Sequence, residues 1–139
     1  MMAIAIHNIN RSWELIREAD EYVLSVPGES LANETLQCGI ISLKDQDKVK
    51  ALKLDLHPSE RVRVPGLQRA IANIELKKFA SIETGDHSLV VGSVLKFAVN
   101  TRCRERPLIS VGPDTRGYTV LAQKGIHRIA VVDRPMYGP

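Results

Sequence analysis

One stretch decides the fold, Ala70 to Asn100: AIANIELKKFASIETGDHSLVVGSVLKFAVN. Residues 72–77 alternate between apolar and polar side chains, which is the pattern of a strand with one buried face. Residues 88–100 are nearly all apolar and rich in β-branched side chains, which predicts a central strand covered on both faces. Gly85-Asp86-His87 lies between the two runs and begins with two common turn residues. The stretch therefore predicts a long β-hairpin.

Two points in this hairpin are irregular. The alternation slips at Lys78-Phe79, which predicts a β-bulge in the first strand. Gly92 interrupts the second run, and a glycine inside a strand favours a sharp bend or the close approach of another backbone.

Shorter elements are predicted on both sides of the hairpin. Before it, we expect a buried strand at Met2–Ile6, a helix at Ser12–Ala19, a strand at Tyr22–Val26, a helix from Ser30 to Gly39 and a weakly helical segment at Asp45–Leu54. After it, we expect strands at Leu108–Val111, Tyr118–Leu121 and Ile126–Val132. The sequence thus predicts a single domain over residues 1–139, mainly β with short helices.

Composition narrows the class of protein. The chain has 139 residues, of which 44% are hydrophobic and 25% charged, close to the average of soluble globular proteins. No apolar run is long enough to cross a membrane, and the apolar start at residues 1–6 is too short for a signal peptide. We therefore expect a cytoplasmic protein without a membrane partner.

Charge and metal-binding residues exclude further classes. Cys38 and Cys103 are too few for a disulfide framework and are expected to be reduced, and the four histidines form no metal-ligand motif. The net charge of +3 would suit an anionic ligand. The densest basic stretch, Arg102–Arg106, has no interleaved aromatic residues on which bases could stack, so we expect no nucleic-acid partner.

Asn10-Arg11-Ser12 lies between a predicted strand and the start of a predicted helix. Backbone N–H groups and the helix dipole favour an anion at such a place, and Arg11 and Ser12 add a guanidinium and a hydroxyl that suit a phosphate. The alternative is that Asn10 and Ser12 are ordinary helix caps and Arg11 is a surface charge. Spacing alone favours this alternative, because capping residues occur at most helix starts.

Two further candidates also have a structural explanation. His87 could project from the start of a rigid strand toward a cofactor, but Gly85-Asp86-His87 is equally explained as a bare hairpin turn. Tyr118 follows the turn that begins at Gly112 and could border a ligand with its ring and hydroxyl, although an isolated tyrosine is more often half-buried packing.

Taken in order, these segments resemble the flavin reductases that have an FMN-binding split barrel. The similar segments are residues 3–6 followed by Asn10-Arg11-Ser12, Tyr22 to Pro27, Asp47-Lys48-Val49, Val64-Pro65 to Ile74, Gly85 to Val94, and Pro107-Leu108 through Tyr118. The resemblance runs over essentially the whole chain, and the order of several short motifs carries it.

The resemblance implies an antiparallel Greek-key split β-barrel and hydride transfer from NAD(P)H to FMN, or to FAD in its place. It implies a homodimer that holds the flavin in a groove between its subunits, with a monooxygenase or another electron acceptor as a further partner. Asn10, Arg11 and Ser12 would hold the phosphate. His87, with Asp86, would lie beside the isoalloxazine or nicotinamide as the catalytic candidate, and Tyr118 would border the same cleft.

Members of this family usually carry about one strand pair before the stretch that resembles the start of this chain. The resemblance therefore leads to the expectation that the coding sequence begins upstream of Met1, or that the protein is shortened and its barrel incomplete. Two other functions stay open: a flavin-carrying electron-transfer protein that receives electrons from another protein, and a cofactor-free interaction protein.

Overall fold

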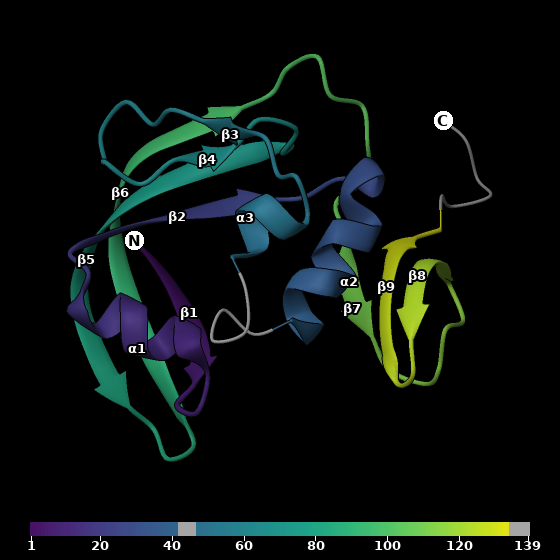
Figure 1. Ribbon diagram of the computed structural model, residues 1–139, viewed down its shortest axis with the longest axis horizontal. Coiled ribbons are helices and arrows are strands. Elements are labelled where there is room, and N and C mark those ends of the chain that lie inside the picture. Colours follow the sequence, from purple (N-terminus) through teal and green to yellow (C-terminus); the bar gives the residue numbers. More distant parts are fainter. Residues whose placement is uncertain (42–46, 134–139) are drawn as a thin grey trace.

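The computed structural model describes residues 1–41 and 47–133. Its elements are β1 (Met2–His7), α1 (Arg11–Glu18), β2 (Glu21–Val26), the 3₁₀ helix η1 (Glu29–Leu31), α2 (Ala32–Ile40), α3 (Lys48–Ala51), β3 (Leu56–His57), β4 (Gly66–Leu67), β5 (Ala72–Glu83), β6 (His87–Val99), β7 (Ile109–Val111), β8 (Tyr118–Lys124) and β9 (His127–Val132). Figure 1 shows β5 and β6 beside α1 and β1 in one half of the molecule, and α2 with β7, β8 and β9 in the other.

The predicted hairpin is confirmed as β5 and β6, the two middle strands of an antiparallel sheet with the order β1-β6-β5-β2. Its turn contains Gly85 with φ +97°, a backbone conformation that glycine adopts without strain. The pairing shifts register between Lys78 and Ala80, which confirms the predicted bulge, and shifts again between Glu75 and Leu76. The long strands curl as a result, and the sheet forms a half-barrel (Figure 1).

One face of this sheet carries the first core. Tyr22, Ile74, Leu76 and Val90 are buried together, and α1 covers them with Trp13 and Ile16. These two helical residues are three positions apart, so they lie on the same side of α1. This packing fixes α1 against the sheet and with it the start of the helix.

Gly92 is a point of close approach, but the approaching group differs from the prediction of a second backbone or a sharp bend. A Cβ atom there would lie 2.4 Å from the hydroxyl oxygen of Tyr22, so the approaching group is a side chain and not a second backbone. The Tyr22 hydroxyl is buried and has no hydrogen-bond partner among the described residues, and this burial raises the pKa of Tyr22.

Two predictions about burial are wrong. The strand predicted as buried at Met2–Ile6 is β1, an edge strand whose residues are exposed or half-buried, because only β6 pairs with it. β6 is not covered on both faces: its first half alternates between buried and half-buried residues, and its second half is largely open, with Phe97 59% exposed. An apolar run therefore predicted that a strand forms, but not which of its faces are buried.

The shorter elements differ from their predictions mainly at their ends. The Ser30–Gly39 helix is observed as η1 followed by α2, which continues to Ile40. Of the helical segment predicted at Asp45–Leu54, residues 45 and 46 lie outside the described residues, and α3 covers only Lys48–Ala51. The last three predicted strands are confirmed as β7, β8 and β9, which form a second sheet with the order β7-β9-β8.

The second sheet packs against α2. Ala32 and Leu36 of the helix are buried against Ala122 and Ile129 of the strands, with Leu108 at the margin. This small core is separate from the one under α1.

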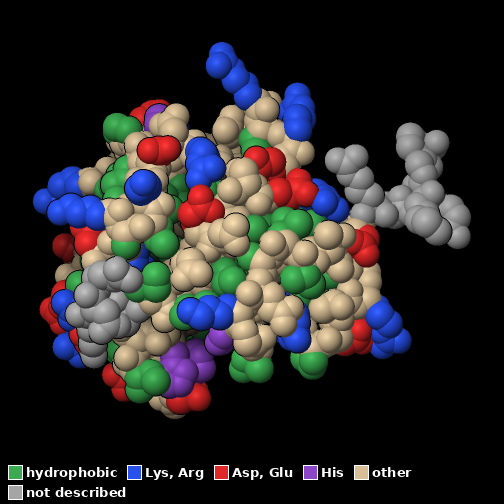
Figure 2. Space-filling model, turned by 45° about the vertical axis from the view of Figure 1, so that its right-hand side comes forward, with side chains coloured by type: hydrophobic (Ala, Val, Ile, Leu, Met, Phe, Trp, Pro, Cys, Tyr) green, Lys and Arg blue, Asp and Glu red, His purple; other side chains and the backbone are tan. Residues whose placement is uncertain are grey.

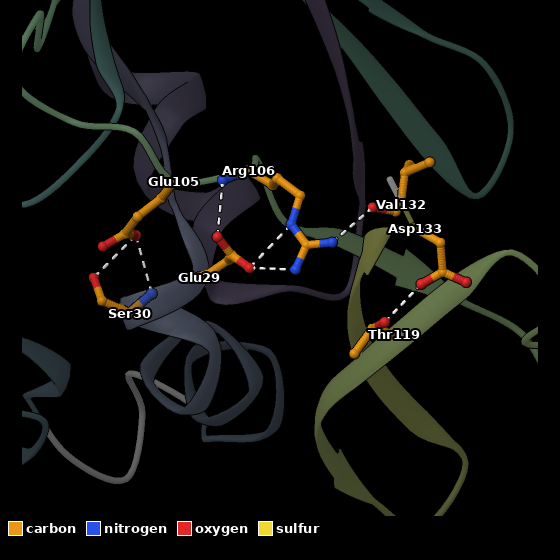
Figure 3. A network of polar contacts seen from close by, with 7 residues as sticks. All are labelled: Glu29, Ser30, Glu105, Arg106, Thr119, Val132 and Asp133. Atoms are coloured by element: carbon orange, nitrogen blue, oxygen red, sulfur yellow. Dashed lines mark hydrogen bonds and ion pairs between the residues drawn. The ribbon is translucent and has the colours of Figure 1, made fainter. Parts of the chain in front are cut away.

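A polar network joins the second sheet to the segment that follows β2 (Figure 3). Arg106 lies between Glu29 and Val132: its Nε and backbone N donate to the Glu29 carboxylate at 3.0 and 3.1 Å, and its Nη1 donates to the Val132 carbonyl oxygen at 3.0 Å. Beside it, the backbone N and hydroxyl of Ser30 both donate to Glu105, at 3.0 and 3.1 Å. A guanidinium that donates in several directions holds three segments in one arrangement.

Lys78 fixes the far end of α1. Its ammonium donates to the carbonyl oxygens of Ile16 and Arg17, at 3.2 and 2.6 Å, and its backbone N donates to the Asp20 carbonyl oxygen at 2.7 Å. The last carbonyl groups of a helix lack intrahelical partners and carry the negative end of the helix dipole. A lysine there donates hydrogen bonds to these carbonyl groups and places a positive charge beside the negative end of the dipole. The bulge after Lys78 thus lies where β5 holds the helix.

Glu75 is a buried carboxylate, only 3% exposed, on the side of the sheet away from α1. The backbone N–H groups of Glu60 and Arg61 donate to its two oxygens at 3.1 and 2.5 Å. Burial alone would raise the pKa of Glu75, but these bonds, one from Val62 and the charge of Lys96 lower it below its ordinary value.

We predict that Glu75→Gln lowers the free energy of unfolding by about 2 kcal/mol near pH 7, because the amide cannot replace charged hydrogen bonds to several N–H groups. A carboxyl whose pKa is lowered by folding stabilises the protein above its unfolded pKa of about 4.3, and that contribution is lost as the pH falls through the folded value. The difference between wild type and variant should therefore be constant above about pH 5.5 and shrink in more acidic buffer. Urea unfolding across this range measures it, and a difference independent of pH would contradict the assignment.

Candidate functional site

The candidate residues of the hairpin turn lie where β1 ends and β6 begins. The two strands pair so that His7 stands opposite His87 and Ile6 opposite Ser88. Beyond the last pair, the backbone N of Asn8 donates to the carbonyl oxygen of Asp86 at 2.9 Å. The end of β1 therefore closes against the turn that carries Asp86 and His87.

The side chain of Asn8 ties this junction together. Its amide nitrogen donates to the Gly85 carbonyl oxygen at 2.9 Å, and its carbonyl oxygen accepts from the hydroxyl of fully buried Ser88 at 2.7 Å. One amide thus holds the first residue of the turn and the second residue of β6.

His87 is held between a carboxylate and a second imidazole. Its Nδ1 lies 2.8 Å from Asp86 Oδ1, and the centres of the His87 and His7 rings are 4.7 Å apart. The hydrogen bond from His87, followed by the charge of that ring, lowers the pKa of Asp86 below its ordinary value. The His87 side chain is 42% exposed and that of Asp86 76% exposed, and Figure 2 shows histidine side chains gathered at the lower edge of the face in view.

The start of α1 follows directly from this junction. The backbone N of Asn10 donates to the His7 carbonyl oxygen at 3.0 Å, and α1 begins at the next residue. Asn10 occupies the capping position, but no side chain makes a capping hydrogen bond there. The side-chain capping bonds expected of Asn10 and Ser12 are therefore not seen in the described structure, and within the first turn the backbone N of Trp13 donates to the carbonyl oxygen of Asn10 at 2.9 Å.

A hollow of about 260 Å³ opens beside this helix start. Asn10, Arg11 and Ser12 line one side of it, and residues 38–41 and Lys48 line the other. The ammonium of Lys48 donates to the carbonyl oxygen of Cys38, near the end of α2. Burial raises the pKa of Cys38, and the charge of Lys48 opposes that rise, so the thiol is neutral.

Both cations of the hollow have partners within the chain. Arg11 donates through Nη1 to Glu14 of the same helix, and Lys48 donates to a neutral carbonyl group. The arrangement combines two positive side chains, a hydroxyl and a helix start without a side-chain cap, which suits a phosphate.

Tyr118 does not join the other candidates within one chain. It begins β8 in the second sheet and is 37% exposed, on the other side of the molecule from the β5–β6 turn (Figure 1). The structure thus brings five of the six predicted residues to one end of the first sheet: Asn10, Arg11, Ser12, Asp86 and His87.

Sequence reasoning missed three residues of this region, His7, Asn8 and Lys48. The signal for Lys48 was its place in the segment Asp47-Lys48-Val49, which resembles a family segment, but nothing in the sequence places it against Ser12. His7 and Asn8 appear in the sequence only as the polar end of a strand, and their roles depend on the register of β1 against β6.

Within residues 1–41 and 47–133, no three His, Cys, Asp or Glu side chains are grouped so that they could hold a metal ion. No helix in these ranges has the length and apolar character needed to span a membrane.

A curled antiparallel half-barrel is the fold expected of the flavin reductase-like split barrels. The family model described as "Flavin reductase like domain" matches residues 1–119. The chain therefore belongs to the flavin reductase-like family, and the expected fold is confirmed.

Individual relatives agree with this placement. An uncharacterised protein of Archaeoglobus fulgidus is 34% identical over 95 residues, which are 68% of this chain and 54% of that protein. The chain spans about half the length of the curated relatives it matches. Among solved structures, the FMN-binding protein of Thermus thermophilus with bound p-hydroxybenzaldehyde has a TM-score of 0.71 at 18% identity. The match covers 99% of this chain and 71% of the Thermus thermophilus chain. Component B of nitrilotriacetate monooxygenase from Bacillus cereus has a TM-score of 0.69 at 17% identity, and the match covers 99% of this chain and 68% of the Bacillus cereus chain.

We predict that Asn8→Ala loosens the end of the sheet and lowers the free energy of unfolding by about 1–3 kcal/mol, because it leaves the buried Ser88 hydroxyl without its acceptor. Asn8→Asp, which keeps the acceptor but not the donor, should cost less. Denaturant unfolding compares the variants, and equal stability of Asn8→Ala and wild type would show that the amide does not hold the turn.

Proposed function

We propose that this protein is an FMN-binding NAD(P)H:flavin oxidoreductase. The observation that carries the proposal is the hollow beside α1, where the three residues expected to hold a phosphate line one wall and Lys48 stands on the other. Family membership supports a flavin, and the Thermus thermophilus neighbour is itself described as an FMN-binding protein. When bound, the flavin accepts a hydride from the nicotinamide, and the protein supplies position and electrostatics.

The phosphate end is formed by the start of α1. The guanidinium of Arg11 and the hydroxyl of Ser12 donate to phosphate oxygens, the first-turn N–H groups add the helix dipole, and Lys48 adds a second charge from the facing wall. The residues present thus fit a phosphate monoester, because every group named is a donor or a positive charge.

The ring end is formed by the β5–β6 turn. Asp86 holds His87 through Nδ1, which leaves Nε2 of His87 to contact the ring system or the nicotinamide. Hydride transfer needs the donor and acceptor atoms about 3–3.5 Å apart and no general base, so His87 acts by shaping and orienting the site.

We also propose that a second copy of the chain completes the groove. β5 and β6 expose apolar side chains that a monomer leaves in water: Phe79 at 71%, Ile82 at 52%, Leu95 at 44%, Phe97 at 59% and Val99 at 53%. Exposed apolar area of this kind is typical of a protein interface. A dimer would also let Tyr118 of the partner subunit border the groove, which a single chain does not allow. The monooxygenase component among the structural neighbours supports an oxygenase as the electron acceptor.

The test is steady-state oxidation of NADH and NADPH with and without added FMN, together with the absorption spectrum of the purified protein. A flavin band and FMN-dependent oxidation above the buffer rate are expected. Bound flavin without any NAD(P)H oxidation would instead support a flavin-carrying electron-transfer protein. Colourless protein that ignores excess FMN would support a cofactor-free interaction protein and contradict the proposal.

We predict that Arg11→Ala weakens FMN binding by about 1.5–3 kcal/mol, because it removes a charged hydrogen bond to the phosphate. Arg17→Ala is the matched control, since it removes the same side chain from the exposed end of the same helix, where Arg17 pairs with Glu18. Quenching of flavin fluorescence measures both affinities, and equal effects of the two variants would contradict the phosphate assignment.

We predict that His87→Ala slows hydride transfer by more than it weakens FMN binding, because the imidazole orients the reacting rings and makes no contact with the phosphate. Pre-steady-state reduction of bound flavin by NADH gives the first quantity and a flavin titration gives the second. Negligible effects on both would leave His87 as a turn residue.

A further inference from the structure

Arg11 is paired with an acidic residue of its own helix. Glu14 follows it by three positions in α1, and Nη1 of Arg11 forms an ion pair with Oε2 of Glu14. The two side chains are 42% and 33% exposed, so solvent weakens this pair without abolishing it. Glu14 also lies in the first turn of α1, where the helix dipole favours a negative charge. In the described structure, a carboxylate thus pairs with the guanidinium that the proposed function assigns to a phosphate.

The second cation of the hollow has a different kind of partner. Lys48 donates to the carbonyl oxygen of Cys38, which is neutral. An incoming phosphate therefore has to replace only a dipole at Lys48, but at Arg11 it meets a negative charge. Two anions at one guanidinium repel each other, so freeing Arg11 opposes the binding of any anion in the hollow.

We propose that Glu14 is a specificity-determining residue, whose carboxylate competes with the phosphate of the ligand for Arg11. This inference rests on the proposed function, since it assumes that the hollow takes a phosphate. Inorganic phosphate makes contacts only in the hollow, so no other contact offsets the cost of displacing Glu14 from Arg11. The phosphate of FMN arrives with a ring system that makes its own contacts elsewhere. The competition therefore lowers the affinity for FMN and for free phosphate alike, and it narrows the preference of the site for FMN over riboflavin, which carries no phosphate.

The experiment compares FMN, riboflavin and inorganic phosphate as ligands of wild type, Glu14→Gln and Glu18→Gln. Glutamine keeps the size and the acceptor oxygen of Glu14 but removes its charge. Glu18→Gln makes the same charge change at the other end of α1, where Glu18 pairs with Arg17. Fluorescence titration gives the dissociation constants of the two flavins, and competition against FMN gives that of inorganic phosphate. Thermal unfolding confirms that each variant is folded.

In Glu14→Gln, the ratio of the riboflavin to the FMN dissociation constant should rise about three- to fivefold, the range expected for a partly exposed ion pair. Inorganic phosphate should bind more tightly by a similar factor, and Glu18→Gln should change neither. An unchanged or lower ratio in Glu14→Gln, or an equal rise in Glu18→Gln, would overturn the inference. If wild type binds FMN and riboflavin equally, the phosphate assignment itself is wrong. If wild type prefers FMN and Glu14→Gln leaves that preference unchanged, only the role of Glu14 is overturned.

Discussion

The arrangement of the candidate site depends on the register of β1 against β6. His7 stands opposite His87, and this pairing alone determines which residues of the β1–α1 connection meet the hairpin turn. A shift by one residue would turn Ile6 away from the core and bring His7 into it, because side chains alternate between the two faces of a strand. The buried residues on β5 and β6 exclude such a shift, so the apolar core and the polar site are specified together.

The start of α1 is placed by constraints at both ends of the helix. Near the start, Asn10 donates to the carbonyl oxygen of His7, and at the end Lys78 donates to the last carbonyl groups. Trp13 holds the middle of the helix against the core. The anion site that we propose at this helix start needs this rigidity, since the dipole of a helix is felt only within its first turn. The bulge in β5 therefore contributes to a site that it does not touch.

The sequence predicted those features that depend on neighbours in the chain. The hairpin and the bulge after Lys78 follow from period-two alternation and from where it breaks, and both are confirmed. Gly92 is a point of close approach, but side chains lie there where a second backbone or a bend was predicted. The cover of each strand could not be predicted in this way. An apolar strand such as β1 has the same composition whether it lies at the edge or in the middle of a sheet. Its position depends on strands that come from distant segments of the chain.

The same limit applies to the candidate site. Asn10, Arg11 and Ser12 could be singled out because they lie at one helix start, and Asp86 and His87 because they lie in one turn. That the two groups share one end of the sheet is a property of strand order, and so is the distance of Tyr118 from both. Lys48 reaches the hollow from a separate helix, so no spacing in the sequence pairs it with Arg11.

Glu14 and Glu75 show how the surroundings of a carboxylate decide what it can do. Glu75 is buried and accepts from the backbone N–H groups of Glu60 and Arg61, so removing its charge weakens charge-assisted hydrogen bonds that solvent does not replace. Glu14 is partly exposed and pairs with Arg11, whose side chain is itself 42% exposed. The first carboxylate is therefore fixed in the structure, whereas the second is placed to compete with a ligand in the way that we propose. An ion pair that is weak enough to break and close enough to compete is the kind that can tune the affinity of a neighbouring anion site.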